Sequence, residues 1–145
     1  MIGFGDAVGR YYKNYFKFSG RASRAEYWWP VLMQLIVYFA LIVAFVMMAG
    51  FESGSGSGDM SGGAAALLIG GVLVLLLNVI PGYAVAARRF HDLDQTGWLV
   101  LVFVLANAIV GVSVFAQLIW FSLRGTDGPN QYGPDPYAYD ADVFG

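Results

Sequence analysis

The sequence of 145 residues contains no cysteine and only one histidine, His91. The absence of cysteine excludes a disulfide framework, a thiolate nucleophile and any cysteine-ligated zinc or iron–sulfur site. With one histidine, a three-histidine metal site cannot be built within one chain, and a Ser-His-Asp arrangement must use His91. Several common classes of metal and catalytic site are therefore excluded by composition alone.

Charged residues are also scarce, at 12% of the chain against 58% hydrophobic residues, whereas soluble domains carry about a quarter charged residues. So many apolar side chains require lipid rather than water around them. The eight Lys and Arg residues, in a chain of formal net charge -2, are too few and too localised for a nucleic-acid-binding surface. We therefore expect a membrane protein with no nucleic-acid partner and no cofactor.

Three apolar runs are each long enough to cross a hydrocarbon core about 30 Å thick, at about 1.5 Å per helical residue. They cover residues 28–49, 64–87 and 98–123. The alternative, three buried helices of a soluble bundle, is disfavoured because no run shows a polar face at helical spacing. The expected fold class is all-α, an integral membrane protein in which residues 1–145 form a single membrane domain with three transmembrane helices.

The third run allows a second interpretation, because Gly111 lies near its middle. The segment either crosses the membrane once or folds back as a re-entrant hairpin that returns the tail to the side it left. Each half has about 12 residues and is too short to cross alone, and a lipid-exposed turn leaves backbone groups unpaired. These arguments favour the single crossing.

Residues 4–18 are expected to form an N-terminal amphipathic helix. Its apolar and aromatic residues fall on one side of a helical wheel and its basic residues on the other, namely Phe4, Val8, Tyr11, Tyr12, Tyr15 and Phe16 against Arg10, Lys13 and Lys17. This pattern is typical of a helix lying in the membrane interface. The same apolar face is equally suited to packing on the protein's own membrane helices.

Two starting points compete for the first membrane helix. Ser23 and Glu26 have the spacing of a capping box, in which the hydroxyl and the carboxylate satisfy each other's backbone amides. A helix that starts there contains Pro30 in its second turn. The alternative is a start near Trp29, with Pro30 at the first helical position.

The positions of Lys and Arg predict the orientation. Residues 1–27 hold Arg10, Lys13, Lys17, Arg21 and Arg24, the loop 88–97 holds Arg88 and Arg89, and the Gly/Ser linker 50–63 holds none. Because Lys and Arg accumulate on the cytoplasmic side, the N-terminus and the loop are expected to be cytoplasmic. Three crossings then place the linker and the polar Gly/Pro-rich tail, residues 124–145, outside, and only Arg124 disagrees.

Three polar segments separate or flank the apolar runs: FSGRASRAEYWW at 18–29, RRFHDLDQTGW at 88–98 and GTDGPNQYGPDP at 125–136. In this order they resemble domain-of-unknown-function family 805, the YhaH-like small inner-membrane proteins, which share an F-x-G-R-x-x-R-x-E-Y-W opening, an R-R-x-H-D loop and a G-T-x-G-x-N-x-Y/F-G-P-x-P ending. The resemblance covers nearly the whole chain and implies a multi-pass protein of the bacterial plasma (inner) membrane. The family has no established activity for the resemblance to imply.

The matching positions lie in all three segments. They are Gly20, Arg21, Arg24, Glu26, Tyr27 and Trp28, then Arg88, Arg89, His91 and Asp92, then the tail motif Gly125, Thr126, Gly128, Asn130, Tyr132, Gly133, Pro134 and Pro136. The sequence departs from the family pattern at Pro30, Asp127 and Gln131 and in its long Gly/Ser linker. These departures leave the expected architecture intact.

The candidate site combines the charged residues of the first two segments. Arg21, Arg24, Glu26, Arg88, Arg89, His91 and Asp92 are expected to form a cytoplasmic polar cluster or to contact lipid phosphates, since a guanidinium holds a carboxylate or a phosphate through paired hydrogen bonds. Glu26 or Asp92 is expected to pair with an arginine of the other segment. A topology signal plus a helix cap explains the same residues without function. His91, Asp92 and Asp94 lie too close in sequence for good metal geometry, so we expect no metal site and no catalytic residue.

Four neutral amides, Gln34, Asn78, Asn107 and Gln117, lie within the apolar runs. Their donors and acceptors need partners, so hydrogen bonds between helices are expected, and a polar conduit is the alternative. No charged residue lies inside the runs, which removes the usual signature of proton-coupled transport.

The sequence therefore predicts a non-enzymatic interaction, accessory or scaffold protein, with an oligomeric small channel or carrier as the alternative. The expected partners are the lipid bilayer, including anionic lipids, and either further copies of this chain or another membrane protein.

Overall fold

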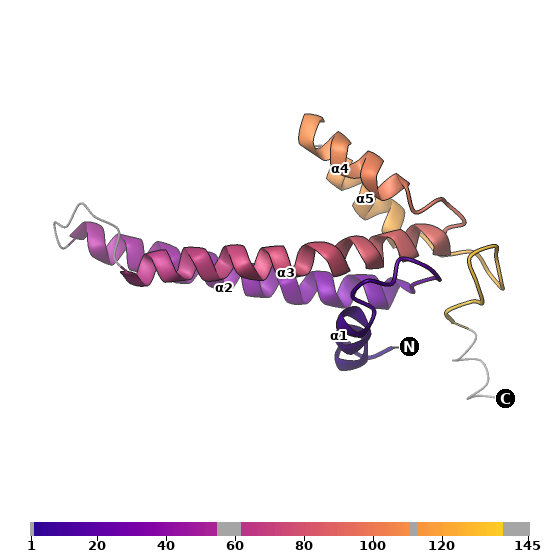
Figure 1. The fold of residues 1–145 in the computed structure, drawn as a ribbon, viewed down its shortest axis with the longest axis horizontal. Coiled ribbons are helices and arrows are strands. Elements are labelled where there is room, and N and C mark those ends of the chain that lie inside the picture. The colour runs from indigo at the N-terminus through magenta and orange to yellow at the C-terminus, as the bar shows by residue number, and fades with distance from the viewer. Residues whose placement is uncertain (1, 55–61, 111–112, 138–145) are drawn as a thin grey trace. The chain divides into compact units, whose positions relative to one another are not determined.

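A computed structural model describes residues 2–54, 62–110 and 113–137 of the chain. These residues form five α-helices: α1 (Phe4–Lys13), α2 (Arg24–Gly54), α3 (Gly62–Asp92), α4 (Leu99–Val110) and α5 (Ser113–Ser122) (Figure 1). The expected all-α class is confirmed. Residues 55–61 of the Gly/Ser linker and residues 138–145 of the tail lie outside the described residues.

Two of the helices, α2 and α3, are long and apolar enough to cross a membrane. They contain the first two expected runs and extend beyond them at both ends. The capping box sets the start of α2: Ser23 Oγ accepts from the Glu26 amide at 3.3 Å, and Glu26 Oε2 accepts from the Ser23 amide at 3.0 Å. The start near Trp29 is not observed, and Pro30 lies inside the helix.

By its internal contacts the chain divides into two compact units. The first, Val31–Val79, consists of parts of α2 and α3, and most of its large apolar side chains are exposed. Within it, Gln34 Nε2 donates to Asn78 Oδ1 at 3.4 Å, and Asn78 Nδ2 donates to the Val74 carbonyl at 2.8 Å. These two amides therefore supply hydrogen bonds between and within the helices.

The second unit combines Met1–Pro30 with Ile80–Gly145. Here α1 buries Ala7 and Tyr11, while Phe4 packs edge-on against Trp29 with ring centroids 5.6 Å apart. Part of the apolar face of α1 therefore packs on the protein itself, and Phe4 and Tyr12 stay partly exposed. The helix ends at Lys13, short of the expected residues 4–18.

The third apolar run differs from the expectation of one helix over 98–123, because it forms α4 and α5, which pack against each other (Figure 1). The rings of Phe103 and Trp120 lie 5.8 Å apart, whereas a continuous helix separates these positions by about 25 Å. Phe90 of α3 contacts Phe103, Trp120 and Phe121. The hairpin is thus held on α3 by aromatic packing that hydrophobicity along the sequence does not reveal.

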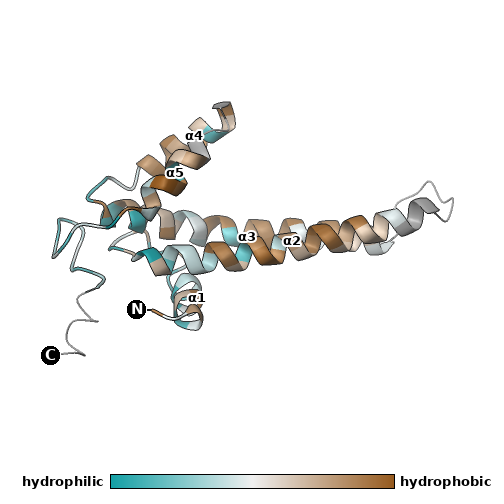
Figure 2. Cartoon of the chain, turned by 180° about the vertical axis from the view of Figure 1, so that it is seen from behind, coloured by the Kyte–Doolittle hydropathy of each residue, from teal (hydrophilic) through white to brown (hydrophobic). Residues whose placement is uncertain are grey.

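Hydropathy is distributed unevenly between the helices and the polar segments (Figure 2). Hydrophobic residues cover α4, α5 and the helices of the Val31–Val79 unit, while hydrophilic residues gather at the start of α2, the end of α3 and the tail. We call the second group the cap: residues 2–27, 88–98 and 124–137. Residues 18–27 of the first polar motif and all residues of the other two motifs lie in it.

Candidate functional site

The cap is organised around the carboxylate of Asp92, in the last turn of α3. Arg21 approaches one oxygen, with Nε 3.0 Å and Nη2 2.9 Å from Oδ1. Arg89, three residues earlier on the same helix, donates from Nη1 to Oδ2. All three side chains are almost fully buried. The single carboxylate faces two guanidinium charges, and the other donors of both arginines bind backbone carbonyls. We refer to Arg21, Arg89 and Asp92 as the Asp92 cluster.

The remaining donors of Arg21 bind the tail. Its Nη2 donates to the Thr126 carbonyl at 2.6 Å, and its Nη1 donates to the Gly128 carbonyl. The guanidinium therefore joins the segment before α2, the end of α3 and the tail, using the fixed fork of donors that a lysine lacks.

Arg89 caps the end of the hairpin. Its Nε and Nη2 donate to the Phe121 carbonyl at 3.2 and 3.1 Å, and Nη2 also donates to the Leu123 carbonyl. Carbonyls at a helix C-terminus have no partner within the helix and carry partial negative charge, which a buried cation stabilises. Arg89 therefore fixes the end of α5 beside the end of α3.

Two tail residues fit closely against Asp92. Thr126 donates to the Asp92 carbonyl oxygen from its amide at 2.9 Å and from its hydroxyl at 3.1 Å. A Cβ atom on Gly125 would collide with the Asp92 carboxylate. The Gly-Thr pair of the tail motif is therefore explained by close backbone approach to the cluster.

The rest of the tail motif surrounds His91. Asn130 Nδ2 donates to the His91 carbonyl at 2.8 Å, and the Tyr132 ring stacks on the imidazole at 4.0 Å. The imidazole Nδ1 lies 3.0 Å from the Gly20 carbonyl, and because a carbonyl oxygen only accepts, Nδ1 carries the proton. His91 thus connects the same three segments as Asp92.

Asp135 orders the tail beyond this point. Its carboxylate accepts from the Tyr137 amide at 2.9 Å and the Gly128 amide at 3.0 Å. These hydrogen bonds, that of Tyr137 first, lower the pKa of the half-buried Asp135 below its ordinary value. Gly128 and Gly133 have φ of 75° and 141°, in the region that favours glycine.

The three polar segments contact one another, but some of their ion pairs differ from the expected ones. Glu26 binds Arg10 of α1 at 3.2 Å, a partner that sequence reasoning did not identify. Asp92 binds Arg21 and Arg89, while Arg24 is exposed and its amide donates to the Tyr137 hydroxyl. Asp92 thus pairs with an arginine of the other segment, as expected of Glu26 or Asp92, whereas the partner of Glu26 lies in α1, outside both segments.

Arg88, an expected site residue, and Asp94, which the sequence did not place in the site, lie at the edge of this arrangement. Arg88 is buried and its Nε lies 3.4 Å from the Ala84 carbonyl, while its own carbonyl accepts from the Ala22 amide at 3.1 Å. Asp94 accepts from Gln131 at 3.2 Å. Asp92, His91 and Asp94 therefore each bind a different protein group and do not converge on one point.

The amides of the third run lie on the hairpin, with Asn107 on α4 and Gln117 on α5, both half-buried.

The arrangement has the chemistry of a structural junction. Both oxygens of Asp92 are held by arginines. Among the residues that the structure describes, no buried side-chain nitrogen or oxygen lacks a hydrogen-bond partner. A group poised to transfer a proton must reach its substrate, and Asp92 is fully enclosed by its partners. The residues of the Asp92 cluster therefore hold the cap together.

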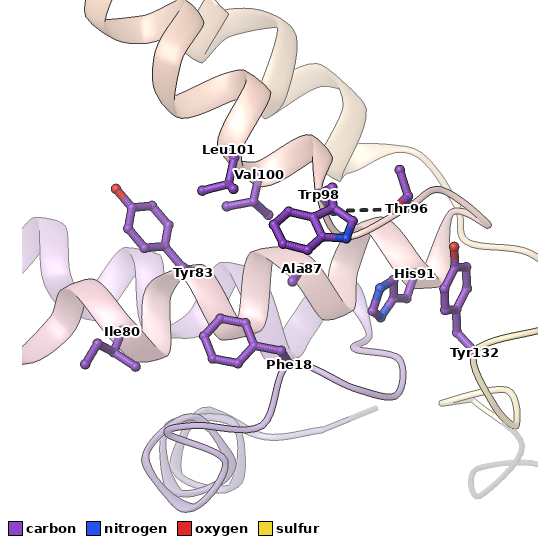
Figure 3. A pocket seen from close by; sticks show the side chains of 11 residues that line it. Phe18, Ile80, Tyr83, Ala87, His91, Thr96, Trp98, Val100, Leu101 and Tyr132 are labelled. Carbon is purple, nitrogen blue, oxygen red and sulfur yellow. Dashed lines mark hydrogen bonds between the residues drawn. The ribbon is translucent and has the colours of Figure 1, made fainter.

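A pocket of about 680 Å³ lies beside this junction, between α3, the start of α4, the segment after α1 and the tail (Figure 3). Its walls are mostly apolar and aromatic and include Phe18, Tyr83, Trp98 and Leu101. His91, Thr96 and Tyr132 lie at one end of it and Ile80 and Tyr83 at the other (Figure 3). Sequence reasoning did not anticipate this pocket.

Comparison with known proteins agrees with the motifs. A family profile described as "Protein of unknown function (DUF805)" matches residues 15–134. The chain is 36% identical over 124 residues to inner membrane protein YhaH of Escherichia coli K12, covering 86% of this chain and 90% of the relative. It is 38% identical over 125 residues to inner membrane protein YhaI of the same strain, covering 86% and 89%.

No solved structure matches the chain. The family match covers the first two polar motifs and residues 125–134 of the third, and both relatives are matched over most of their length. The chain belongs to the DUF805 family of inner membrane proteins of unknown function.

Proposed function

We propose that this protein is a non-enzymatic accessory protein of the inner membrane that presents its cap to other membrane proteins. The observation that carries the proposal is the saturated Asp92 cluster, which commits the most distinctive charged residues of the chain to holding three segments together. The exposed side chains of the cap, among them Phe16, Lys17 and Arg24, remain for recognition.

In this proposal α2 and α3 cross the bilayer and α4 and α5 form a hairpin inserted from one side. At about 1.5 Å per residue, α4 reaches about 18 Å and α5 about 15 Å, each about half of the hydrocarbon core. The aromatic contacts and the α4–α5 packing support the hairpin. Helix α1 lies at the interface, with Phe4 and Tyr12 toward lipid and Tyr11 toward the protein.

Both termini are then cytoplasmic, because the tail binds the same end of α3 as the N-terminal segment. This placement replaces the external C-terminus expected from three crossings. It also removes the one exception to the charge rule, since Arg124 joins the other seven Lys and Arg residues on the cytoplasmic side. The linker, which has no Lys or Arg, is external.

Photo-crosslinking in native membranes tests the accessory role. Benzoylphenylalanine at Phe16, which is 73% exposed on the cap, is expected to give discrete protein adducts. The matched control at Ile69, 58% exposed on α3, is expected to give lipid adducts alone. No protein adduct at Phe16, together with solute flux in proteoliposomes that Asn78→Ala abolishes, would instead favour the channel or carrier.

A further inference from the structure

We propose that the pocket beside His91 binds one acyl chain of a bilayer phospholipid, with the glycerol-ester region of that lipid at the His91 end. The inference rests on the membrane placement proposed above. The observations behind it are the shape, the lining and the position of the pocket. The pocket has no part in the structural role of the Asp92 cluster.

The pocket follows one stripe of α3. Ile80, Tyr83, Ala87 and His91 line it, and their spacing of three and four residues places them on one face of the helix. From Ile80 to His91 the stripe is about 16 Å long, close to the roughly 15 Å depth of one leaflet. A cavity that runs this far along a spanning helix has the direction and length of a lipid chain.

The polarity of the lining changes along the stripe in the same order as the polarity along a phospholipid, from apolar chain to polar headgroup. The deeper part is bounded by Ile80, Tyr83 and Leu101, whereas the end near the tail offers the Thr96 hydroxyl, the Tyr132 hydroxyl and the imidazole of His91 (Figure 3). Since Nδ1 of His91 is committed to the Gly20 carbonyl, the ring's remaining polar atom is Nε2. These groups suit ester and phosphate oxygens or a headgroup hydroxyl.

The pocket is also accessible from the bilayer. Trp98, Leu101 and Tyr83 line it while remaining 73%, 50% and 40% exposed. Trp favours the depth of the lipid headgroups, so the rim at Trp98 lies where a lipid enters from the side. A volume of about 680 Å³ falls in the range of pockets that enclose ligands.

Native mass spectrometry of the full chain tests the proposal. The detergent-purified protein, after delipidation, is incubated with dioleoyl phosphatidylglycerol or with oleate. One phospholipid per chain is expected to be retained, and Leu101→Trp, which fills the pocket, is expected to reduce retention at least tenfold. Leu105→Trp is the matched control, because Leu105 lies one turn further along α4, is 64% exposed and does not line the pocket.

Three results would overturn the proposal: no retained phospholipid, equal loss in both variants, or retention of oleate without phospholipid. Circular dichroism of both variants verifies that the helices remain folded. Cysteine labelling of the same chain in cells reports the membrane placement independently. A missing lipid adduct in a chain with a cytoplasmic tail therefore rejects the pocket alone, whereas an external tail rejects the placement on which the pocket depends.

Discussion

The carboxylate of Asp92 is shared by two buried guanidinium groups that also hold backbone carbonyls from the hairpin and the tail. Removal of one member of a buried charged group leaves the others uncompensated in a medium of low dielectric, which costs far more than the loss of an exposed ion pair. The stability of the cap should therefore depend steeply on this residue.

We expect Asp92→Asn to lower the free energy of unfolding by about 3 kcal/mol or more, because Arg21 and Arg89 keep their charges and lose their counterion. Unfolding in mixed micelles titrated with denaturing detergent measures the change. Asp127→Asn is the matched control. The Arg124–Asp127 pair is 2.7 Å apart but about three-quarters exposed, so its loss should cost about 0.5 kcal/mol or less. Equal effects of the two variants would refute the structural role of Asp92.

Gly125→Ala should destabilise the cap by about 1–3 kcal/mol, because the added Cβ overlaps the Asp92 carboxylate. To relieve the overlap, either the backbone at residue 125 or the buried Asp92 cluster has to move. The same unfolding titration measures it. Gly5→Ala serves as the control, since a Cβ at Gly5 of α1 meets no atom within 4 Å. A Gly125→Ala protein as stable as the control would show that the tail does not approach Asp92.

The tail beyond Gly128 should loosen at low pH. The folded pKa of Asp135 lies below its ordinary value because the Tyr137 and Gly128 amides bind the carboxylate. The stability that the ionised carboxylate gives to the folded tail is therefore fully present above the unfolded pKa of about 3.9. This stability is lost as the pH falls through the lower pKa of the folded state. Hydrogen exchange of the Gly128 and Tyr137 amides, relative to unstructured peptides, should lose protection below about pH 4. In Asp135→Asn this pH-dependent loss should be absent.

At the scale of elements, the two long helices and the capping box follow directly from sequence. Hydrophobic length predicts α2 and α3 because a run longer than the bilayer thickness has few soluble alternatives, and Ser23 with Glu26 marks the start of α2 through local hydrogen bonds. Local signals of this kind act within one turn and need no knowledge of the rest of the fold.

The hairpin and the position of the tail could not be predicted from local sequence signals. One continuous apolar run is consistent with either one helix or two, and the choice depends on contacts of α4 and α5 with Phe90 and Arg89 of α3. The pairing of Asp92 with Arg21, 71 residues away, likewise depends on which segments meet. The tail motif is identified only by its resemblance to the family, and its residue spacing does not show where the tail binds.

The hairpin itself can be tested by chemical crosslinking. In a chain without cysteine, Phe103→Cys with Trp120→Cys should react intramolecularly with a short bis-maleimide, because the two rings lie 5.8 Å apart. The product is detected as a mass increase of one reagent bridging both peptides. Each single variant is the control, and it should carry a reagent attached at one end. A double variant that behaves like the two singles would favour the continuous helix, in which these positions are about 25 Å apart.

In the molecule as a whole, the charges and the contacts both support the placement proposed above. The N-terminal segment, the Arg88 loop and the tail are joined by Arg21 and Asp92, and together they contain all eight Lys and Arg residues. The linker between the two long helices contains none. The proposed even number of crossings, with the cap in the cytoplasm, accounts for both facts.

The accessibility of single cysteines in intact cells tests this placement most directly. Gly62→Cys, at the exposed start of α3, should react with a membrane-impermeant maleimide, and Ser19→Cys, Thr96→Cys and Pro129→Cys should react only after the membrane is permeabilised. All four positions are exposed or open, so protection reports the side of the membrane rather than burial. Labelling of Pro129→Cys in intact cells, with Ser19→Cys and Thr96→Cys protected, would contradict the account, since a tail bound to Asp92 cannot lie across the membrane from the Arg88 loop.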